Sequence, residues 1–121
     1  MTDQTTTKEL TPPELLYARF SNGDVDGMLA LLTTDVEWVN EPKGEHVEGK
    51  VALRAHWERQ WNAAKIELAP VDIAPTDSGV LVVVQERVST HSGKVLFEGR
   101  VGHAYTIRDG LIARCDIVDA P

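Results

Sequence analysis

The sequence predicts an α+β domain in which helices come first and a run of antiparallel strands follows. Three observations lead to this class: apolar residues recur with helical period in the first half, with strand period in the second half, and glycine-containing turns separate the strands. The chain has 121 residues, enough for one hydrophobic core and too few for two ordinary domains. We therefore expect the helices to cover one face of a single sheet.

The N-terminal residues predict a tail and two short helices. Residues 1–10 are polar and rich in threonine, so we expect a flexible tail ahead of one domain that spans residues 11–121. Thr11 is placed to cap the first helix, with prolines in its first turn and Glu14 completing a capping box. Asp24 is placed to cap a second helix.

A strand and the longest helix follow. Residues 35–40 read as a strand that ends at the proline-containing segment 41–44, and residues 45–49 read as a loop. Residues 50–64 have neither proline nor glycine and keep the helical period. The predicted buried face of this helix consists of Leu53, Trp57, Trp61 and Ala64.

The second half predicts four antiparallel strands, at about residues 66–75, 80–90, 94–108 and 111–119. The separators Thr76-Asp77-Ser78-Gly79, His91-Ser92-Gly93-Lys94 and Arg108-Asp109-Gly110 are typical of hairpin turns. Because strand side chains alternate, the helix-facing set on the third strand is expected to be Phe97, Val101, His103, Tyr105 and Ile107.

One strand is apolar on both faces. Residues 80–84 are all apolar, so alternation cannot leave either side polar. A second layer must cover such a strand, and another copy of the same sheet is the simplest cover. We therefore expect a homodimer that forms through the outer face of the sheet.

Charge and composition exclude several classes of partner. The formal net charge is −7, and an acidic chain repels phosphate, so we expect no nucleic-acid partner. Cys115 is the single cysteine, which excludes an internal disulfide and a cysteine-based metal site. No apolar run is long enough for a leader or a membrane span, so we expect no membrane partner and a cytoplasmic location.

Four motifs in order resemble the NTF2-like superfamily, and most closely its SnoaL-like members, which include polyketide cyclases and share a fold with ketosteroid isomerases. The motifs are Phe20–Asp26, Leu31–Trp38, Val47–Lys50 and Arg108–Ile112. The resemblance implies a cone-shaped barrel, with three N-terminal helices packed on a curved, mainly antiparallel sheet. It also implies an apolar pocket for a small hydrophobic or carbonyl-containing ligand.

The resemblance points to three candidate catalytic residues. Glu41, before a proline, falls on the position of the isomerase base, and His103 falls on the position of an oxyanion-hole acid. Asp119 resembles the base that cyclase-like members carry on the last strand. The alternatives remain open: Glu41 could be an exposed loop residue, His103 a satisfied core histidine, and Asp119 a solvated terminal carboxylate.

The candidate ligand-binding residues are mostly aromatic. We expect Tyr17, Trp38, Trp57, Tyr105 and Cys115 to shape the pocket, although tryptophans at helical spacing are more often simply core. Glu86 and Arg87 lie on opposite faces of their strand, so one of them could reach the pocket, while a surface ion pair is the default interpretation.

The histidines occur without metal-ligand spacing, and no phosphate-binding loop or nucleophile motif is present. The sequence therefore predicts acid–base chemistry with no metal and no cofactor, in an isomerase, cyclase or dehydratase. Two alternatives come from other classes: a non-catalytic module that binds a small ligand or dimerises, and a protein–protein adaptor that uses the outer sheet face.

Overall fold

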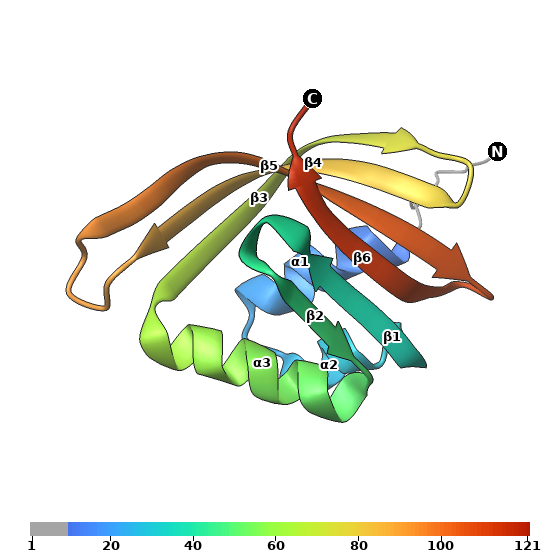
Figure 1. The fold of residues 1–121 in the computed structure, drawn as a ribbon, viewed down its shortest axis with the longest axis horizontal. Helices are drawn as coiled ribbons and strands as arrows, with labels where there is room; N and C mark the ends of the chain where they lie inside the picture. Colours follow the sequence, from blue (N-terminus) through green and yellow to red (C-terminus); the bar gives the residue numbers. More distant parts are fainter. Residues whose placement is uncertain (1–9) are drawn as a thin grey trace, which may run out of the picture.

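The computed structural model describes residues 10–121 and has the predicted α+β architecture (Figure 1). Apart from Leu10, the predicted tail lies outside the described residues. Among those residues, three α-helices and one 3-10 turn accompany a single six-stranded sheet. The sheet curves, and the helices lie on its concave side (Figure 1).

The sheet is ordered β2-β1-β6-β5-β4-β3. Neighbouring strands are antiparallel except for β1 and β6, which run parallel. This arrangement places the last strand of the chain in the interior of the sheet. The strands are β1 (Leu32–Asn40), β2 (Glu45–Glu48), β3 (Lys65–Pro75), β4 (Gly79–Ser89), β5 (Val95–Arg108) and β6 (Leu111–Asp119).

The predicted helix caps are present. Helix α1 (Pro12–Ser21) begins with a capping box, in which the backbone N–H of Thr11 donates to Glu14 Oε1 over 3.0 Å. Helix α2 (Val25–Leu29) begins where Asp24 Oδ1 accepts from the backbone N–H of Gly27 over 2.9 Å. Helix α3 (Lys50–Ala63) is the longest of the three, as predicted.

The prediction of a loop over residues 45–49 is wrong, because residues 45–48 form strand β2. The 3-10 turn Glu41–Lys43 reverses the chain, and Gly44 ends it with φ at +66°, a left-handed value that glycine adopts without strain. The chain then pairs antiparallel with the end of β1, so that Trp38 lies opposite Val47. A short run rich in charged residues carries little strand signal of its own, so this hairpin depends on its turn.

The core lies between the concave face of the sheet and helices α1 and α3. Leu53 and Trp57 are buried on the predicted face of α3, and Leu16 and Tyr17 are buried on α1. The sheet contributes a facing set of buried side chains: Trp38, Val82, Val84, Tyr105, Ile112 and Cys115.

No helix among the described residues is both long and apolar enough to cross a membrane.

Leu53 provides a test of this core. Its side chain has no exposed surface, so Leu53→Ala should lower the free energy of unfolding by about 2–5 kcal/mol, through lost burial and a residual cavity. Val51, on the same helix, is 88% exposed, so Val51→Ala should change it by less than about 0.5 kcal/mol. Urea unfolding of both variants checks the difference, and equal effects would contradict this packing.

Candidate functional site

A cavity of about 650 Å³ opens between the concave face of the sheet and helices α1 and α3. Its wall is largely apolar and aromatic, with contributions from Leu16, Phe20, Trp38, Trp57, Ile66 and Val101. Polar groups are fewer, which is typical of a site for a small apolar ligand that a few groups orient.

Three polar side chains form a hydrogen-bonded chain at the wall of this cavity. Tyr105 Oη donates to Tyr17 Oη over 2.8 Å, and Tyr17 Oη lies 2.8 Å from His103 Nδ1. All three residues are buried and line the cavity. Tyr17 comes from α1, whereas His103 and Tyr105 both lie on the inner face of β5. These hydrogen bonds therefore join the helix to the sheet.

The direction of this chain assigns the tautomer of His103. Because Tyr17 Oη accepts from Tyr105, its own proton is free to be donated to His103 Nδ1. Nδ1 is then the acceptor, so a neutral ring carries its proton on Nε2. His103 Nε2 has no hydrogen-bond partner in the part of the chain that the structure describes. The cavity therefore presents an N–H donor to a ligand.

Burial keeps all three groups neutral. Desolvation lowers the pKa of His103 from 6.5 to about 4, because it disfavours the imidazolium. It also raises the pKa of Tyr17 and the pKa of Tyr105 well above their usual values. At neutral pH the site thus offers hydrogen-bond donors without formal charge.

Three carboxylates line the cavity: Glu45, Glu86 and Asp119. The last two lie on the strands that flank β5, at different distances from His103. On β6, Asp119 lies opposite Val101, two residues from His103 along β5, or about 7 Å of strand. On β4, Glu86 lies opposite Gly99, four residues from His103, or about 13 Å of strand. Asp119 is exposed and Glu86 is half-buried.

Half-burial raises the pKa of Glu86, and the positive charge of Lys43 partly opposes this shift. Lys43 also lines the cavity, at the turn between β1 and β2. A carboxyl group with a raised pKa that shares a cavity with an ammonium group is suited to hold or release a proton near a ligand.

Glu41, a predicted catalytic residue, does not join this set. It is exposed at the start of the 3-10 turn and does not line the cavity, whereas its neighbours Asn40 and Pro42 do.

The predicted ligand-binding residues divide in the same way. Trp38 and Trp57 line the cavity, and their rings meet edge to face with centroids 5.3 Å apart. Cys115 is fully buried and does not line the cavity. Burial raises the pKa of its thiol, so Cys115 packs behind the tyrosines as a neutral core residue.

One group of potential metal ligands lies on the β1–β2 hairpin, away from the cavity. Ligand atoms of Glu37, His46 and Glu48 lie within 4.8 Å of one another, the one such group in residues 10–121. Glu37 Oε1, one of these potential ligand atoms, already has protein partners: His46 Nε2 lies 3.0 Å from it and Arg114 Nη1 lies 3.4 Å from it. The Arg114 cation also opposes a second positive charge there.

The sequence did not single out every polar group of the cavity. Lys43 and Glu45 escaped attention because they lie in a predicted break and loop, where no periodicity indicates direction. Glu86 was noted, but residues 80–84 are apolar on both faces, so the sequence did not show that Glu86 shares the inner face with Val82 and Val84.

Comparisons with known proteins agree with this architecture. The family model of the SnoaL-like domain matches residues 14–115. No curated protein sequence matches the chain significantly.

Three solved structures illustrate the similarity. The chain is 23% identical to TerC co-crystallised with polyporic acid, with a TM-score of 0.79 and coverage of 90% of this chain and 88% of that one. It is 19% identical to a Mycobacterium tuberculosis protein in complex with estradiol-17beta-hemisuccinate, with a TM-score of 0.77 and coverage of 88% of each chain. It is 21% identical to the Δ5-3-ketosteroid isomerase from Mycobacterium sp., with a TM-score of 0.76 and coverage of 92% of this chain and 95% of that one. At these identities the similarity shows the fold.

The pKa of His103 predicts a pH dependence of stability. The unfolded chain takes up a proton on this ring near pH 6.5, but the folded protein does so only near pH 4. Stability is therefore lost as the pH falls through this window, by about 3 kcal/mol from this residue alone.

Urea unfolding at pH 7 and pH 4 measures this loss. Between these two pH values, the free energy of unfolding should fall less in His103→Gln than in the parent. In His91→Gln, a change at an exposed position, it should fall as much as in the parent. Ring C–H resonances of His103 give a second measurement, because they should not titrate above about pH 5 in the folded parent. Titration near pH 6.5 would contradict the burial of this ring.

Proposed function

Because the chain belongs to the SnoaL-like domain family, we propose that it is an enzyme that moves a proton next to a carbonyl group of a small apolar ligand. The observation that carries this proposal is the buried, neutral His103, whose Nε2 is free to donate at the wall of an apolar cavity. The reaction classes that fit are isomerisation, aldol-type cyclisation and dehydration, with no cofactor.

The proposed first step is proton abstraction from the carbon next to the carbonyl. Asp119 takes this proton, and the electron pair moves to the carbonyl oxygen, which becomes an enolate. The Nε2–H of His103 donates a hydrogen bond to that oxygen, and this bond strengthens as negative charge develops there. Asp119 is preferred over Glu86 as base because it lies nearer to His103 along the sheet.

The hydrogen-bonded tyrosines support His103 in this role. Tyr17 holds Nδ1 as an acceptor, which keeps the proton on Nε2, and Tyr105 orients Tyr17. A neutral donor in a dry site stabilises an enolate without first having to lose a solvent shell. Glu86, with its raised pKa, is the group that returns a proton to a distant carbon or a leaving hydroxyl.

The solved structures of this fold are consistent with the ligand class. One is a ketosteroid isomerase, and two hold polyporic acid or estradiol-17beta-hemisuccinate, which are small ring compounds with apolar bodies. The cavity of about 650 Å³ offers room for a ligand of that size, and its aromatic wall suits a flat one.

A non-catalytic ligand-binding module is the second candidate. The exposure of Asp119 favours it, because a base in contact with water is less effective than one enclosed with its substrate. In that case the cavity binds the same ligands, and no proton moves.

Solvent-deuterium exchange distinguishes the two candidates. With 2-tetralone as a flat ketone probe in D2O, the parent should speed exchange of the hydrogens next to the carbonyl, followed by NMR. Asp119→Asn should lower this catalysed rate about 100-fold or more, because the base is removed. Asp77→Asn, in the exposed β3–β4 turn, is the matched control and should leave the rate unchanged.

Binding of 2-tetralone without faster exchange would favour the binding module. If Asp119→Asn kept the parent rate and Glu86→Gln lost it, Glu86 would replace Asp119 as the base.

We also propose that the outer face of the sheet forms a homodimer. On this face, away from the helices, Leu81 and Val118 close over Gly102: a Cβ added at Gly102 would lie 2.8 Å from Val118 Cγ2 and 3.4 Å from Leu81 Cδ1. Val118 is 39% exposed, and Val83 lies opposite Gly102 in the ladder. This apolar strip needs a cover, and a second copy supplies a matching one.

Light scattering during size-exclusion chromatography tests the dimer. The parent should have twice the chain mass of 13.3 kDa, and Leu81→Glu should elute as a monomer, because a charge cannot be buried unpaired in the interface. Val51→Glu, on the exposed side of α3, should remain dimeric. A monomeric parent would refute the proposal.

A further inference from the structure

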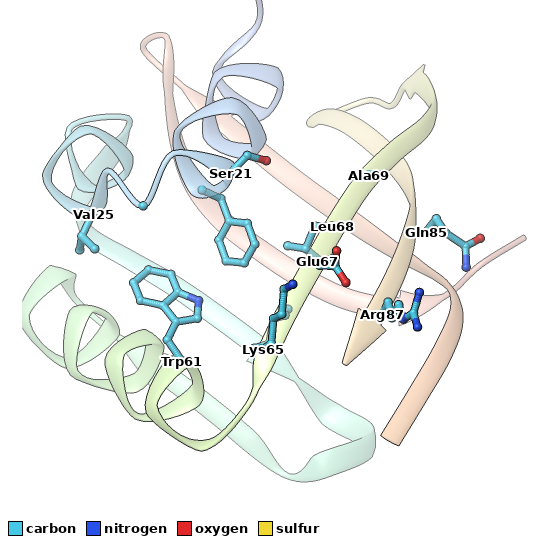
Figure 2. Close-up of a pocket in the computed structure, with 12 residues that line it drawn as sticks. Ser21, Val25, Trp61, Lys65, Glu67, Leu68, Ala69, Gln85 and Arg87 are labelled. Atoms are coloured by element: carbon cyan, nitrogen blue, oxygen red, sulfur yellow. The ribbon is translucent and has the colours of Figure 1, made fainter. Parts of the chain in front are cut away.

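A second cavity, of about 740 Å³, lies along strand β3 at the edge of the sheet. We call it the edge groove. It is lined by the end of α1 and the start of α2, the last turn of α3, residues 65–69 of β3 and two side chains of β4. Figure 2 shows Trp61 projecting from α3 into the opening between α3 and β3, with Gln85 and Arg87 beyond β3.

The floor of the edge groove is aromatic. The rings of Phe20 and Trp61 lie 5.6 Å apart between centroids and are tilted by 55°. These two residues, with Ile66 and Leu68, line both the edge groove and the main cavity. The two cavities therefore share these four apolar residues.

The rim of the edge groove carries two cations. Arg87 lies directly opposite Glu67 across the β3–β4 ladder, and Lys65 is two residues away on the same face of β3. Because strand side chains alternate, this is the outer face of the sheet, whereas Ile66 and Leu68 face the helices. Neither Lys65 nor Arg87 has an ion pair or a side-chain hydrogen bond in residues 10–121. With Glu67 as the one carboxylate, the rim is net positive in a chain of net charge −7.

We propose that the edge groove is a second ligand site, which binds a small amphipathic carboxylate. The apolar part of the ligand lies on Phe20 and Trp61, on the helix side of β3. The ligand passes the open edge of this strand, so that its carboxylate accepts hydrogen bonds from Arg87 and Lys65 on the outer side. This site goes beyond the proposed function, because it needs neither His103 nor a carbonyl group. The two unpaired cations at the outer end of the groove select an acid over a neutral molecule of the same shape.

A ¹H–¹⁵N NMR titration with sodium decanoate tests the site. In the parent, decanoate should change the chemical shifts of the backbone amides of Ser21, Lys65 and Ala69. These changes should saturate, and all three should fit the same dissociation constant. The double variant Lys65→Gln/Arg87→Gln should bind about fivefold more weakly, since each exposed charge contact contributes modestly. The matched control Arg59→Gln/Lys94→Gln removes the same charge from exposed positions outside the groove and should bind like the parent.

A second variant blocks the groove sterically. Ala69 is exposed, lines the edge groove and does not line the main cavity, so Ala69→Trp should abolish these shifts and leave 2-tetralone exchange unchanged. Three results would overturn the proposal: no saturable shifts in the parent, equal weakening in both double variants, or shifts confined to main-cavity residues such as Val101 and Ile117. None of them bears on the chemistry proposed for the main cavity.

Discussion

Burying an imidazole costs free energy unless a hydrogen bond replaces the water it loses. Here the bond to His103 comes from Tyr17 on α1, and Tyr105 in turn donates to Tyr17. The same contacts that make the ring tolerable in the core also hold α1 against the centre of the sheet and leave one ring nitrogen free. Stability and the proposed chemistry thus depend on one three-residue chain, so a change that loosens it affects both.

Most of the fold could be predicted because its local signals agree with one another. The capping box at Thr11, the Asp24 cap and the glycine turns of the second half all lie where the sequence placed them. Strand β2 was missed because its charged residues have low strand propensity and pair only after the turn brings them to β1. The parallel pairing of β1 with β6 joins segments about 80 residues apart, and no local pattern reports it.

The candidate site was predictable to the extent that alternation along strands determines it. His103 and Tyr105 on β5 and Asp119 on β6 line the cavity as period two requires, although their catalytic or binding roles remain proposals. Alternation separated Glu86 from Arg87 without saying which of them faces inward, because the concave side is defined only by the packed helices. Glu41 lies in a 3-10 turn, where neither strand nor helix periodicity predicts a direction.

The interior position of β6 has a consequence for how the chain folds during synthesis. Residues 111–119 pair with β5 on one side and with β1 on the other, so the N-terminal part of the sheet stays unjoined to the rest until they have been made. Until then β1 and β5 each present an open hydrogen-bonding edge. The six-stranded sheet can therefore close only after residues 111–119 have emerged from the ribosome, and the pairing of β1 with β6 is a non-local step.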